Sequence, residues 1–247
     1  MNAIELVFSS EQPMELPIAY HALVQGLLYS VWRETRPFLH DAGFSNGGRG
    51  LRLFTFGPLR GRYQVAGRRI RFAAPLRLEV RSPVSGLLED LCRALPERRD
   101  LALGGVPLRL EQITLRDRLL FPSCALIRTC APIALYRTLP DHRTRYFAPF
   151  DPEWLPGLER NLAEKLAVLG SDAPAALELD PLWPSLCKRV LRFKQTYITG
   201  YTGKFRLRAA PEAMAALYYA GLGSRNSQGC GMFDILSACP AEGEGAP

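Results

Sequence analysis

Short runs of alternating apolar and polar residues recur along the chain. Between them lie longer segments whose apolar residues are spaced as on one face of a helix. Residues 3–9 alternate like a strand, and residues 16–32 carry apolar side chains at helical spacing. The other elements predicted in this half are strands at 51–56, 60–65, 68–72, 76–80 and 106–115, and a helix at 83–95. The first half therefore predicts a β-α-β-β-α-β order with one additional hairpin.

The second half of the chain predicts the same order. Its expected strands are 124–131, 134–137, 177–179, 188–199, 202–207 and 232–236, and its expected helices are 156–169 and 211–220. Two such units imply an α+β fold with two antiparallel sheets, each with helices on one face. We expect domains at 1–120 and 121–237. Residues 238–247 lack core-forming side chains and predict a disordered tail.

A glycine-rich segment separates the last expected helix from the last strand. Gly221, Gly223, Gly229 and Gly231 bracket the polar residues Ser224, Arg225, Asn226, Ser227 and Gln228. Glycine tolerates positive φ, so the N–H groups of such a loop can converge on an anion, and an arginine there can hold a phosphate or stack on a base. Mononucleotide loops run from strand to helix, the opposite order. The segment is therefore either an ordinary turn or a loop that grips a longer phosphate chain.

A basic and aromatic segment precedes this loop. Residues 187–208 contain seven basic side chains, four aromatic ones and no carboxylate. On paired strands, alternation would turn cationic heads and aromatic faces toward an RNA, although an edge hairpin protected by charge is the alternative. The residues predicted to bind RNA are Lys188, Arg192, Lys194, Lys204 and Arg206, together with Gly223, Ser224, Arg225, Asn226, Ser227 and Gln228.

Composition narrows the class of partner. The 247-residue chain has a formal net charge of +7, and only four of its basic residues are lysine. Arginine suits bidentate phosphate contacts and stacking, which favours RNA, although a high-GC genome, which encodes arginine by default, would give a similar bias. The six cysteines form no Cys-x-x-Cys pair, and most are predicted to be reduced core residues. We find no signal peptide or membrane span, so we expect a cytoplasmic protein that does not contact membranes.

Candidate chemistry centres on His40. This residue follows the first expected helix, adjoins the glycine-rich stretch 41–50, and has Tyr29 and Arg52 nearby in sequence. An imidazole exchanges protons near pH 7, and a phenol and a guanidinium can align and stabilise a charged transition state. A histidine that only stabilises a helix end is the alternative. The chain has no His-Glu-x-x-His motif and no paired-aspartate cluster, so we expect neither a metal nor another cofactor.

Several of these stretches together resemble the CRISPR-associated repeat-processing endoribonucleases, the sixth Cas protein family within the RAMP group. In chain order they are Val24 to Ser30, Phe38-Leu-His-Asp41, Leu51 to Leu59, Cys130-Ala-Pro-Ile133 with alanine where the family has serine, and Gly221 to Met232. The last stretch is the most specific. The resemblance implies two tandem ferredoxin-like (RRM-like) βαββαβ domains with antiparallel sheets, and cleavage of CRISPR repeat RNA without a metal.

The resemblance also implies which residues act. His40 matches the family's catalytic histidine, Tyr29 its helix tyrosine, and Arg52 a basic position that lysine often fills. The expected reaction is attack by the RNA 2′-hydroxyl, which cuts precursor crRNA into guide RNAs for antiviral defence. Its products are a 2′,3′-cyclic phosphate, or the ring-opened form, and a 5′-hydroxyl. Other Cas proteins and a homodimer remain open as partners. The alternatives are a non-catalytic RNA-binding subunit of an effector complex and a small-molecule enzyme on the same scaffold.

Overall fold

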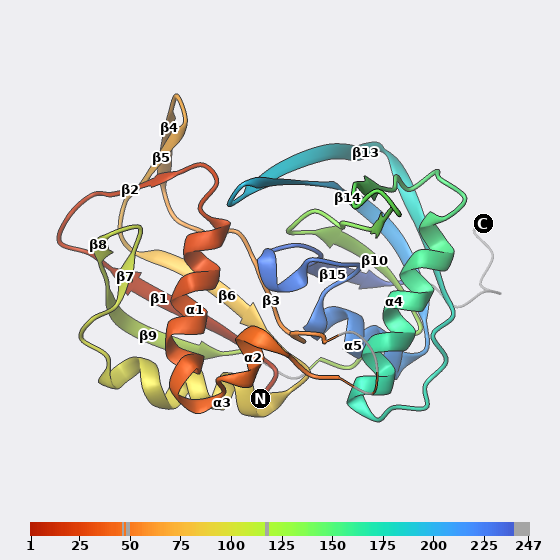
Figure 1. The fold of residues 1–247 in the computed structure, drawn as a ribbon, viewed down its shortest axis with the longest axis horizontal. Coiled ribbons are helices and arrows are strands. Elements are labelled where there is room, and N and C mark those ends of the chain that lie inside the picture. The colour runs from red at the N-terminus through yellow and green to blue at the C-terminus, as the bar shows by residue number, and fades with distance from the viewer. Residues whose placement is uncertain (46, 48–49, 117–118, 240–247) are drawn as a thin grey trace, which may run out of the picture.

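Two βαββαβ units stand next to each other in the computed structural model (Figure 1), which describes residues 1–45, 47, 50–116 and 119–239. The first unit contains β1 (Ala3–Ser9), β2 (Met14–Pro17), α1 (His21–Thr35), α2 (Phe38–Asp41), β3 (Thr55–Phe56), β4 (Tyr63–Ala66), β5 (Arg69–Phe72), β6 (Leu76–Arg81), α3 (Ser85–Ala94), the 3-10 turn η1 (Leu95–Glu97), β7 (Ala102–Leu103), β8 (Val106–Pro107) and β9 (Arg109–Leu115). Its main sheet has the order β3-β6-β1-β9.

The second unit repeats this topology. It contains β10 (Cys124–Thr129), β11 (Tyr136–Thr138), β12 (Thr144–Tyr146), α4 (Trp154–Leu169), β13 (Leu177–Phe193), β14 (Thr196–Ala209), α5 (Pro211–Ala220), the 3-10 turn η2 (Asn226–Gln228) and β15 (Phe233–Ala238). Its sheet has the order β13-β14-β10-β15. Numbered within each unit, both sheets run 2-3-1-4 with antiparallel neighbours. The predicted α+β class with two tandem ferredoxin-like domains is confirmed.

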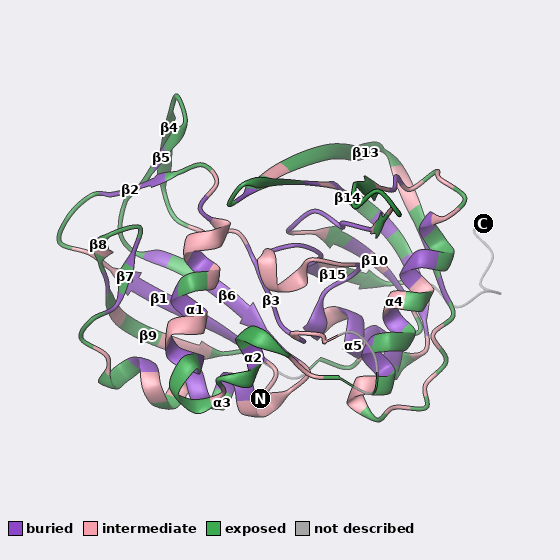
Figure 2. Ribbon diagram, viewed as in Figure 1, coloured by how far each residue is buried: buried purple, intermediate pink, exposed green. Residues whose placement is uncertain are grey.

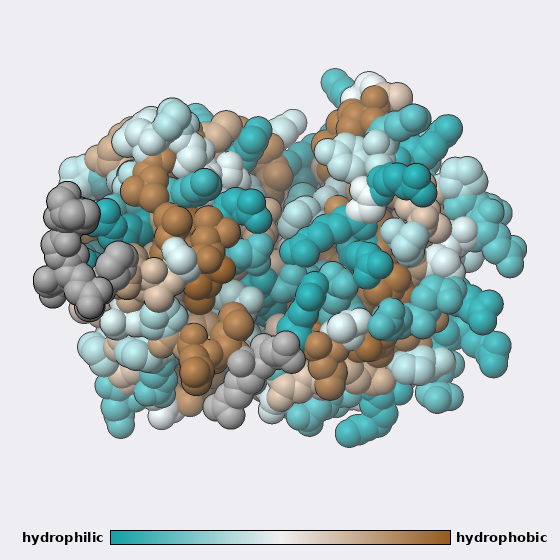
Figure 3. Space-filling view, turned by 180° about the vertical axis from the view of Figure 1, so that it is seen from behind, coloured by the Kyte–Doolittle hydropathy of each residue, from teal (hydrophilic) through white to brown (hydrophobic). Residues whose placement is uncertain are grey.

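Each sheet buries one face under two helices. In the first unit, α1 turns Val24, Leu28 and Trp32 into the core, at helical spacing, and α3 packs beside it. Figure 2 shows the buried residues concentrated on the central strands and on the inner sides of the helices, while β4 and much of β13 are exposed. From behind, apolar patches interrupt a largely hydrophilic surface (Figure 3). None of the described helices is long and apolar enough to cross a membrane.

Helix α1 begins later than the sequence pattern predicted. The helix was expected over 16–32, but Met14–Pro17 form the short strand β2, which pairs with β5. Met14 and Leu16 are buried and alternate with exposed or half-exposed neighbours, as strand residues do. The apolar residues before the helix therefore belong to a strand pattern that the longer helical pattern concealed.

A buried arginine joins the two domains. Arg81, 1% exposed at the end of β6, donates hydrogen bonds to the Phe233 carbonyl oxygen at 2.6 Å and to Asp234 Oδ1 at 2.9 Å, both on β15. Its guanidinium also binds Glu79 and lies 4.0 Å from the centroid of the Tyr218 ring on α5. The charge is thus paired and stacked, which a buried guanidinium requires. These contacts hold the first sheet against the second domain.

The C-terminal strand extends past the predicted end of the second domain. The tail was expected from residue 238, but β15 reaches Ala238, and the Cys239 N–H donates to the Cys124 carbonyl oxygen. Cys124 and Cys239 form a disulfide, and the other four cysteines are free, which agrees with the prediction that most of the six are reduced. The rest of the predicted tail, 240–247, lies outside the described residues. The predicted boundary at 120 falls in the connection between β9 and β10.

Candidate RNA-processing site

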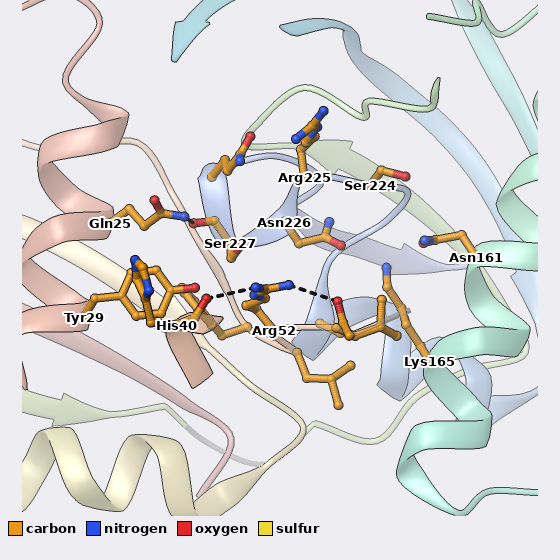
Figure 4. Close-up of a pocket in the computed structure, with 16 residues that line it drawn as sticks. Gln25, Tyr29, His40, Arg52, Asn161, Lys165, Ser224, Arg225, Asn226 and Ser227 are labelled. Atoms are coloured by element: carbon orange, nitrogen blue, oxygen red, sulfur yellow. Dashed lines mark hydrogen bonds between the residues drawn. The ribbon is translucent and has the colours of Figure 1, made fainter. Parts of the chain in front are cut away.

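A cavity of about 280 Å³ lies where the two domains meet (Figure 4). The first domain contributes residues of α1, α2 and the segment before β3, and the second contributes α4 and the glycine-rich loop. Its lining includes Gln25, Tyr29, His40, Arg52, Asn161, Lys165, Ser224, Arg225, Asn226, Ser227 and Gln228. The three residues predicted to be catalytic and the loop predicted to hold RNA therefore line one cavity.

His40 lies on the single-turn helix α2 with its ring open to solvent. Its Nδ1 is 2.7 Å from Asp41 Oδ1, which leaves Nε2 as the ring nitrogen for a substrate. The imidazole meets the Tyr29 ring edge-on, with the ring centroids 5.2 Å apart. Because the side chain of Asp41 is 86% exposed, its pairing with His40 orients the ring more than it stabilises a charge.

Tyr29 is half-buried on α1 between Trp32, Phe54 and His40. Burial raises the pKa of its phenol, against the opposing influences of the Arg52 charge and of hydrogen bonds with the Ser227 and Arg52 side chains. The hydroxyl therefore keeps its proton at neutral pH. It can donate a hydrogen bond to a substrate oxygen while its ring supports the imidazole.

Arg52 binds the backbone around the histidine. Its Nη2 donates to the carbonyl oxygens of His40 and Asp41, each at 2.9 Å, and its Nη1 donates to the Gly50 carbonyl oxygen at 3.1 Å. Figure 4 shows the guanidinium in the middle of the cavity floor, between His40 and the second domain. Its geometry therefore gives Arg52 a positioning role in addition to the charge expected from the sequence.

The glycine-rich loop has the positive backbone φ angles that its glycines predicted. Positive φ occurs at Gly221, Gly223, Gly229 and Gly231, and also at Arg225 with φ 61°. A Cβ on Gly231 would stand 2.1 Å from the Leu222 carbonyl oxygen, so only glycine fits there. The Asn226 side chain donates to the Leu222 and Cys230 carbonyl oxygens. Asn226, predicted to bind RNA, therefore also holds the loop in shape.

The expected anion nest is only partly available. The backbone N–H groups of Leu222, Ser224, Gln228, Gly229 and Gly231 donate to carbonyl oxygens of the protein. These five amides cannot meet an anion, and the loop lines the cavity with the side chains of residues 224–228. The loop contacts the first domain directly, because Gln25 Nε2 on α1 donates a hydrogen bond to the Ser227 carbonyl oxygen at 2.8 Å.

Arg225 is held rather than free. Its guanidinium lies 4.3 Å from the centroid of the Tyr136 ring and shares a hydrogen bond with the Tyr146 side chain. The Arg225 Nε is buried and has no hydrogen-bond partner within the described residues. A donor left in this state beside a cavity is available to a ligand, because an unpaired buried N–H costs about 1–3 kcal/mol.

Two residues of α4 complete the cavity, and the sequence analysis missed both. Lys165 is 3% exposed, and its Nζ donates to the carbonyl oxygens of Gly221 at 2.6 Å and Gly223 at 2.8 Å. Burial lowers the pKa of its ammonium to about 7. Asn161, one turn earlier, has a buried Oδ1 without a hydrogen-bond partner in the described part of the chain. The sequence did contain a signal for Lys165, because this lysine occupies a position of α4 at which the apolar pattern predicts a buried residue.

The predicted basic residues of the long hairpin do not share one face. Lys188, Arg192, Lys194, Lys204 and Arg206 are all exposed on β13, β14 and their connection. The two-residue connection pairs Phe193 with Thr196, so Lys188 lies opposite Tyr201, and even-numbered residues of β13 share a face with odd-numbered residues of β14. Because side chains alternate between the two faces along β14, Lys204 and Arg206 project from one face and Lys188 and Arg192 from the other. Of these five residues, Lys194 lines a cavity that His40 also lines, and none of the five lines the cavity between the domains.

Two other groups of side chains bear on the chemistry. His21 is half-buried beside Tyr20 and Phe56, and the loss of hydration at its ring lowers the pKa of the imidazole to about 4, so it stays neutral at physiological pH. Within the described residues, no three His, Cys, Asp or Glu side chains gather into a cation site.

This chain is similar to CRISPR-associated proteins in the sequence of its second half and in its fold. Residues 119–235 match the family model described as CRISPR associated protein Cas6, C-terminal. No curated protein sequence matches the chain. Among solved structures, the chain is similar to a CRISPR associated protein Cas6 at 20% identity, with a TM-score of 0.76 and coverage of 96% of this chain and 99% of the other.

Two further structures share the fold. A RAMP protein that binds different RNA substrates aligns with a TM-score of 0.80 at 17% identity, over 96% of this chain and 100% of its own. A Cas6-related protein from Pyrococcus furiosus aligns with a TM-score of 0.77 at 16% identity, over 95% of this chain and 98% of its own. At these identities the likeness concerns the fold of the whole chain.

Proposed function

We propose that this chain is a Cas6-type protein that binds CRISPR repeat RNA and cleaves it, because residues 119–235 match the C-terminal model of that family and the whole chain has a similar fold. The observation that carries the proposal is the cavity itself. His40, Tyr29 and Arg52 line it from one domain, and the glycine-rich loop with Arg225 lines it from the other. A solved Cas6 product complex with the same fold, at 21% identity, supports RNA processing as the class of activity.

In the proposed reaction the RNA supplies its own nucleophile. The 2′-hydroxyl attacks the adjacent phosphorus, the P–O5′ bond breaks, and the products are a 2′,3′-cyclic phosphate and a 5′-hydroxyl. The protein has to align the hydroxyl, phosphorus and leaving oxygen, and to move one proton at each end. No metal ligand takes part in this scheme.

The side chains divide these tasks. The His40 ring transfers a proton through Nε2, either from the 2′-hydroxyl or to the leaving oxygen. The Tyr29 hydroxyl, which keeps its proton, donates to an oxygen of the reacting group. Arg52 holds the turn that carries His40 and adds positive charge beneath the phosphate, while Arg225 donates from the opposite wall.

The test is cleavage of a repeat RNA in the presence of EDTA. We expect His40→Ala to lower the single-turnover rate by about 10²–10⁴-fold, the usual contribution of a positioned acid or base, with little change in RNA affinity. An RNA with a 2′-deoxy nucleotide before the scissile phosphate should bind and stay intact. Cleavage by His40→Ala at the wild-type rate, or a strict requirement for magnesium, would contradict the assignment. RNA binding without any cleavage by the wild type would favour the non-catalytic subunit.

A modified substrate identifies the role of His40. Replacing the 5′-bridging oxygen by sulfur gives a leaving group that needs no proton, because thiolates are far more stable than alkoxides. If His40 is the general acid, this substrate restores most of the rate of His40→Ala. If His40 is the general base, the variant stays slow with both substrates.

A further inference from the structure

A second cavity, of about 480 Å³, adjoins the first on the far side of the catalytic residues. Three residues line both cavities, namely Gln25, Tyr29 and His40. Tyr29 and His40, which we propose to be catalytic, therefore lie between the two cavities. A phosphodiester placed at this wall for cleavage would carry one nucleotide into each of them.

The roof of the second cavity is the tip of the β13–β14 hairpin. Phe193 and Ile198 at the tip are buried in a small cluster with Cys230 of the glycine-rich loop, and Ala22 of α1 packs against this cluster. The tip is thereby anchored to both domains. Lys194, in the two-residue connection, lines the cavity from a left-handed backbone with φ 54°. That conformation costs a residue with a side chain about 1–2 kcal/mol.

The floor of the cavity is a glycine in the middle of α1. Gly26 lines the cavity, and nothing lies within 4 Å of the place where its Cβ would stand. Glycine inside a helix costs about 0.5–1 kcal/mol relative to alanine. Packing within the protein does not require this glycine, so the open space above it is available to a ligand that approaches the helix closely.

The charges of the second cavity suit a nucleic-acid strand. Arg33 and Lys194 line it and form no ion pair with a carboxylate of the described residues, whereas Arg36 is paired with Asp90 at 2.7 Å. Asp41, next to His40, is the carboxylate in the lining. Two free cations beside an apolar, glycine-floored surface match a phosphate with its attached ribose and base.

We propose that this cavity is a nucleotide subsite: it holds the RNA nucleotide on the side of the scissile phosphate away from the glycine-rich loop. The ribose and base lie over Gly26, and Lys194 and Arg33 bind the next phosphate of the strand. The inference rests on the proposed function, because it takes single-stranded RNA as the ligand. In this arrangement the tip of the β13–β14 hairpin covers the RNA where it crosses α1.

The test combines a filled cavity with shortened substrates. Three RNAs that cannot be cleaved are compared: the full repeat with a 2′-deoxy nucleotide before the scissile phosphate, the fragment that ends directly before this phosphate, and the fragment that begins directly after it. Gly26→Leu should weaken binding of the full repeat about tenfold, comparable to the loss of one stacked base. It should leave affinity unchanged for the one truncated RNA that lacks the occupying nucleotide. Thr35→Leu adds the same side chain to the same helix outside the cavity and is the matched control.

Two further variants keep the test decisive if Gly26→Leu does not fold. Lys194→Ala and Arg33→Ala should each lower the salt dependence of binding by about one ion, for the full repeat and not for the same truncated RNA. Equal effects of these variants on all three RNAs, or no effect on any, would overturn the subsite. If the wild-type protein neither binds nor cleaves the full repeat, the proposed function fails instead, so the two failures are distinguishable.

Discussion

Three carbonyl oxygens around the histidine turn accept hydrogen bonds from Arg52, and this arrangement makes the arginine part of the local fold. A guanidinium presents several donors in a fixed plane, so it can bind His40, Asp41 and Gly50 at once. A lysine ammonium is a point charge on a flexible stem and cannot reproduce this geometry. Replacing Arg52 by lysine therefore tests whether its positive charge or its hydrogen bonds to the backbone contribute more to the reaction.

Arg52→Lys should lower the single-turnover rate about ten- to a hundredfold while changing RNA affinity little, because a small misplacement of a catalytic group is costly. Arg52→Ala should lower the rate further. Rapid-quench cleavage and equilibrium binding with the 2′-deoxy RNA separate the two quantities. A lysine variant with the wild-type rate would show that positive charge alone is sufficient.

Lys165, which lines the cavity between the domains, makes the stability of the folded protein depend on pH. Its pKa is about 7 when folded and returns to its ordinary value near 10.5 on unfolding. Between these values the unfolded chain binds more protons than the folded one, so stability rises with pH. We expect the free energy of unfolding of the wild type, measured by urea and compared with Lys165→Met, to increase from pH 7 toward 10. Lys188→Met removes an exposed lysine and keeps Lys165, so its difference from the wild type should not change with pH. A difference between the wild type and Lys165→Met that is equally flat would contradict the assignment.

At the scale of elements, the β13–β14 hairpin shows how the length of a turn decides which residues share a face. All five of its predicted RNA-binding residues have even numbers, so alternation along a single strand would place them on one face. The two-residue connection instead pairs Phe193 with Thr196, which sets even-numbered residues of β13 opposite odd-numbered residues of β14 and separates Lys188 and Arg192 from Lys204 and Arg206. Alternation along each strand carries no information about the number of residues in the turn, and that number sets the register.

The two basic pairs of the hairpin should therefore differ in their effect on RNA binding. One strand of RNA contacts one face, so we expect one double variant, Lys188→Ala/Arg192→Ala or Lys204→Ala/Arg206→Ala, to lower the salt slope of binding by about two ions. The other should leave the slope within about half an ion. Filter binding across a salt series measures this. Equal losses from both pairs would show that RNA wraps around the hairpin.

At the scale of the whole molecule, the cavity exists only because the two domains are held in one orientation. Arg81 from the first domain is fully paired with Glu79, Asp234 and the Phe233 carbonyl oxygen. The Thr55 hydroxyl adds a hydrogen bond to the Cys230 carbonyl oxygen at 3.1 Å. Removing the arginine would break the ion pair with Asp234 across the interface, while Glu79 would keep its pair with Arg60 at 2.9 Å.

Arg81→Met should destabilise the protein by about 3–5 kcal/mol, the usual loss when one partner of a buried ion pair is removed. It should also weaken coupling between the domains, so that calorimetry shows two unfolding transitions in place of one. Arg143→Met, which removes an exposed pair with Asp141, should leave the melting temperature unchanged. A single transition at the wild-type temperature for Arg81→Met would show that other contacts hold the domains together.

The sequence by itself determined the two βαββαβ units, helix α5 and the glycine-rich loop, because periodicity and glycine conformation are local properties of the chain. It also singled out His40, Tyr29 and Arg52 as chemical candidates. Long-range contacts alone placed these residues opposite Arg225, buried Lys165 beneath the loop, and set Lys188 and Arg192 on the opposite face of the hairpin from Lys204 and Arg206. The reason is physical: a cavity between two domains depends on contacts between residues far apart in the chain, and such contacts leave no periodic trace in the sequence.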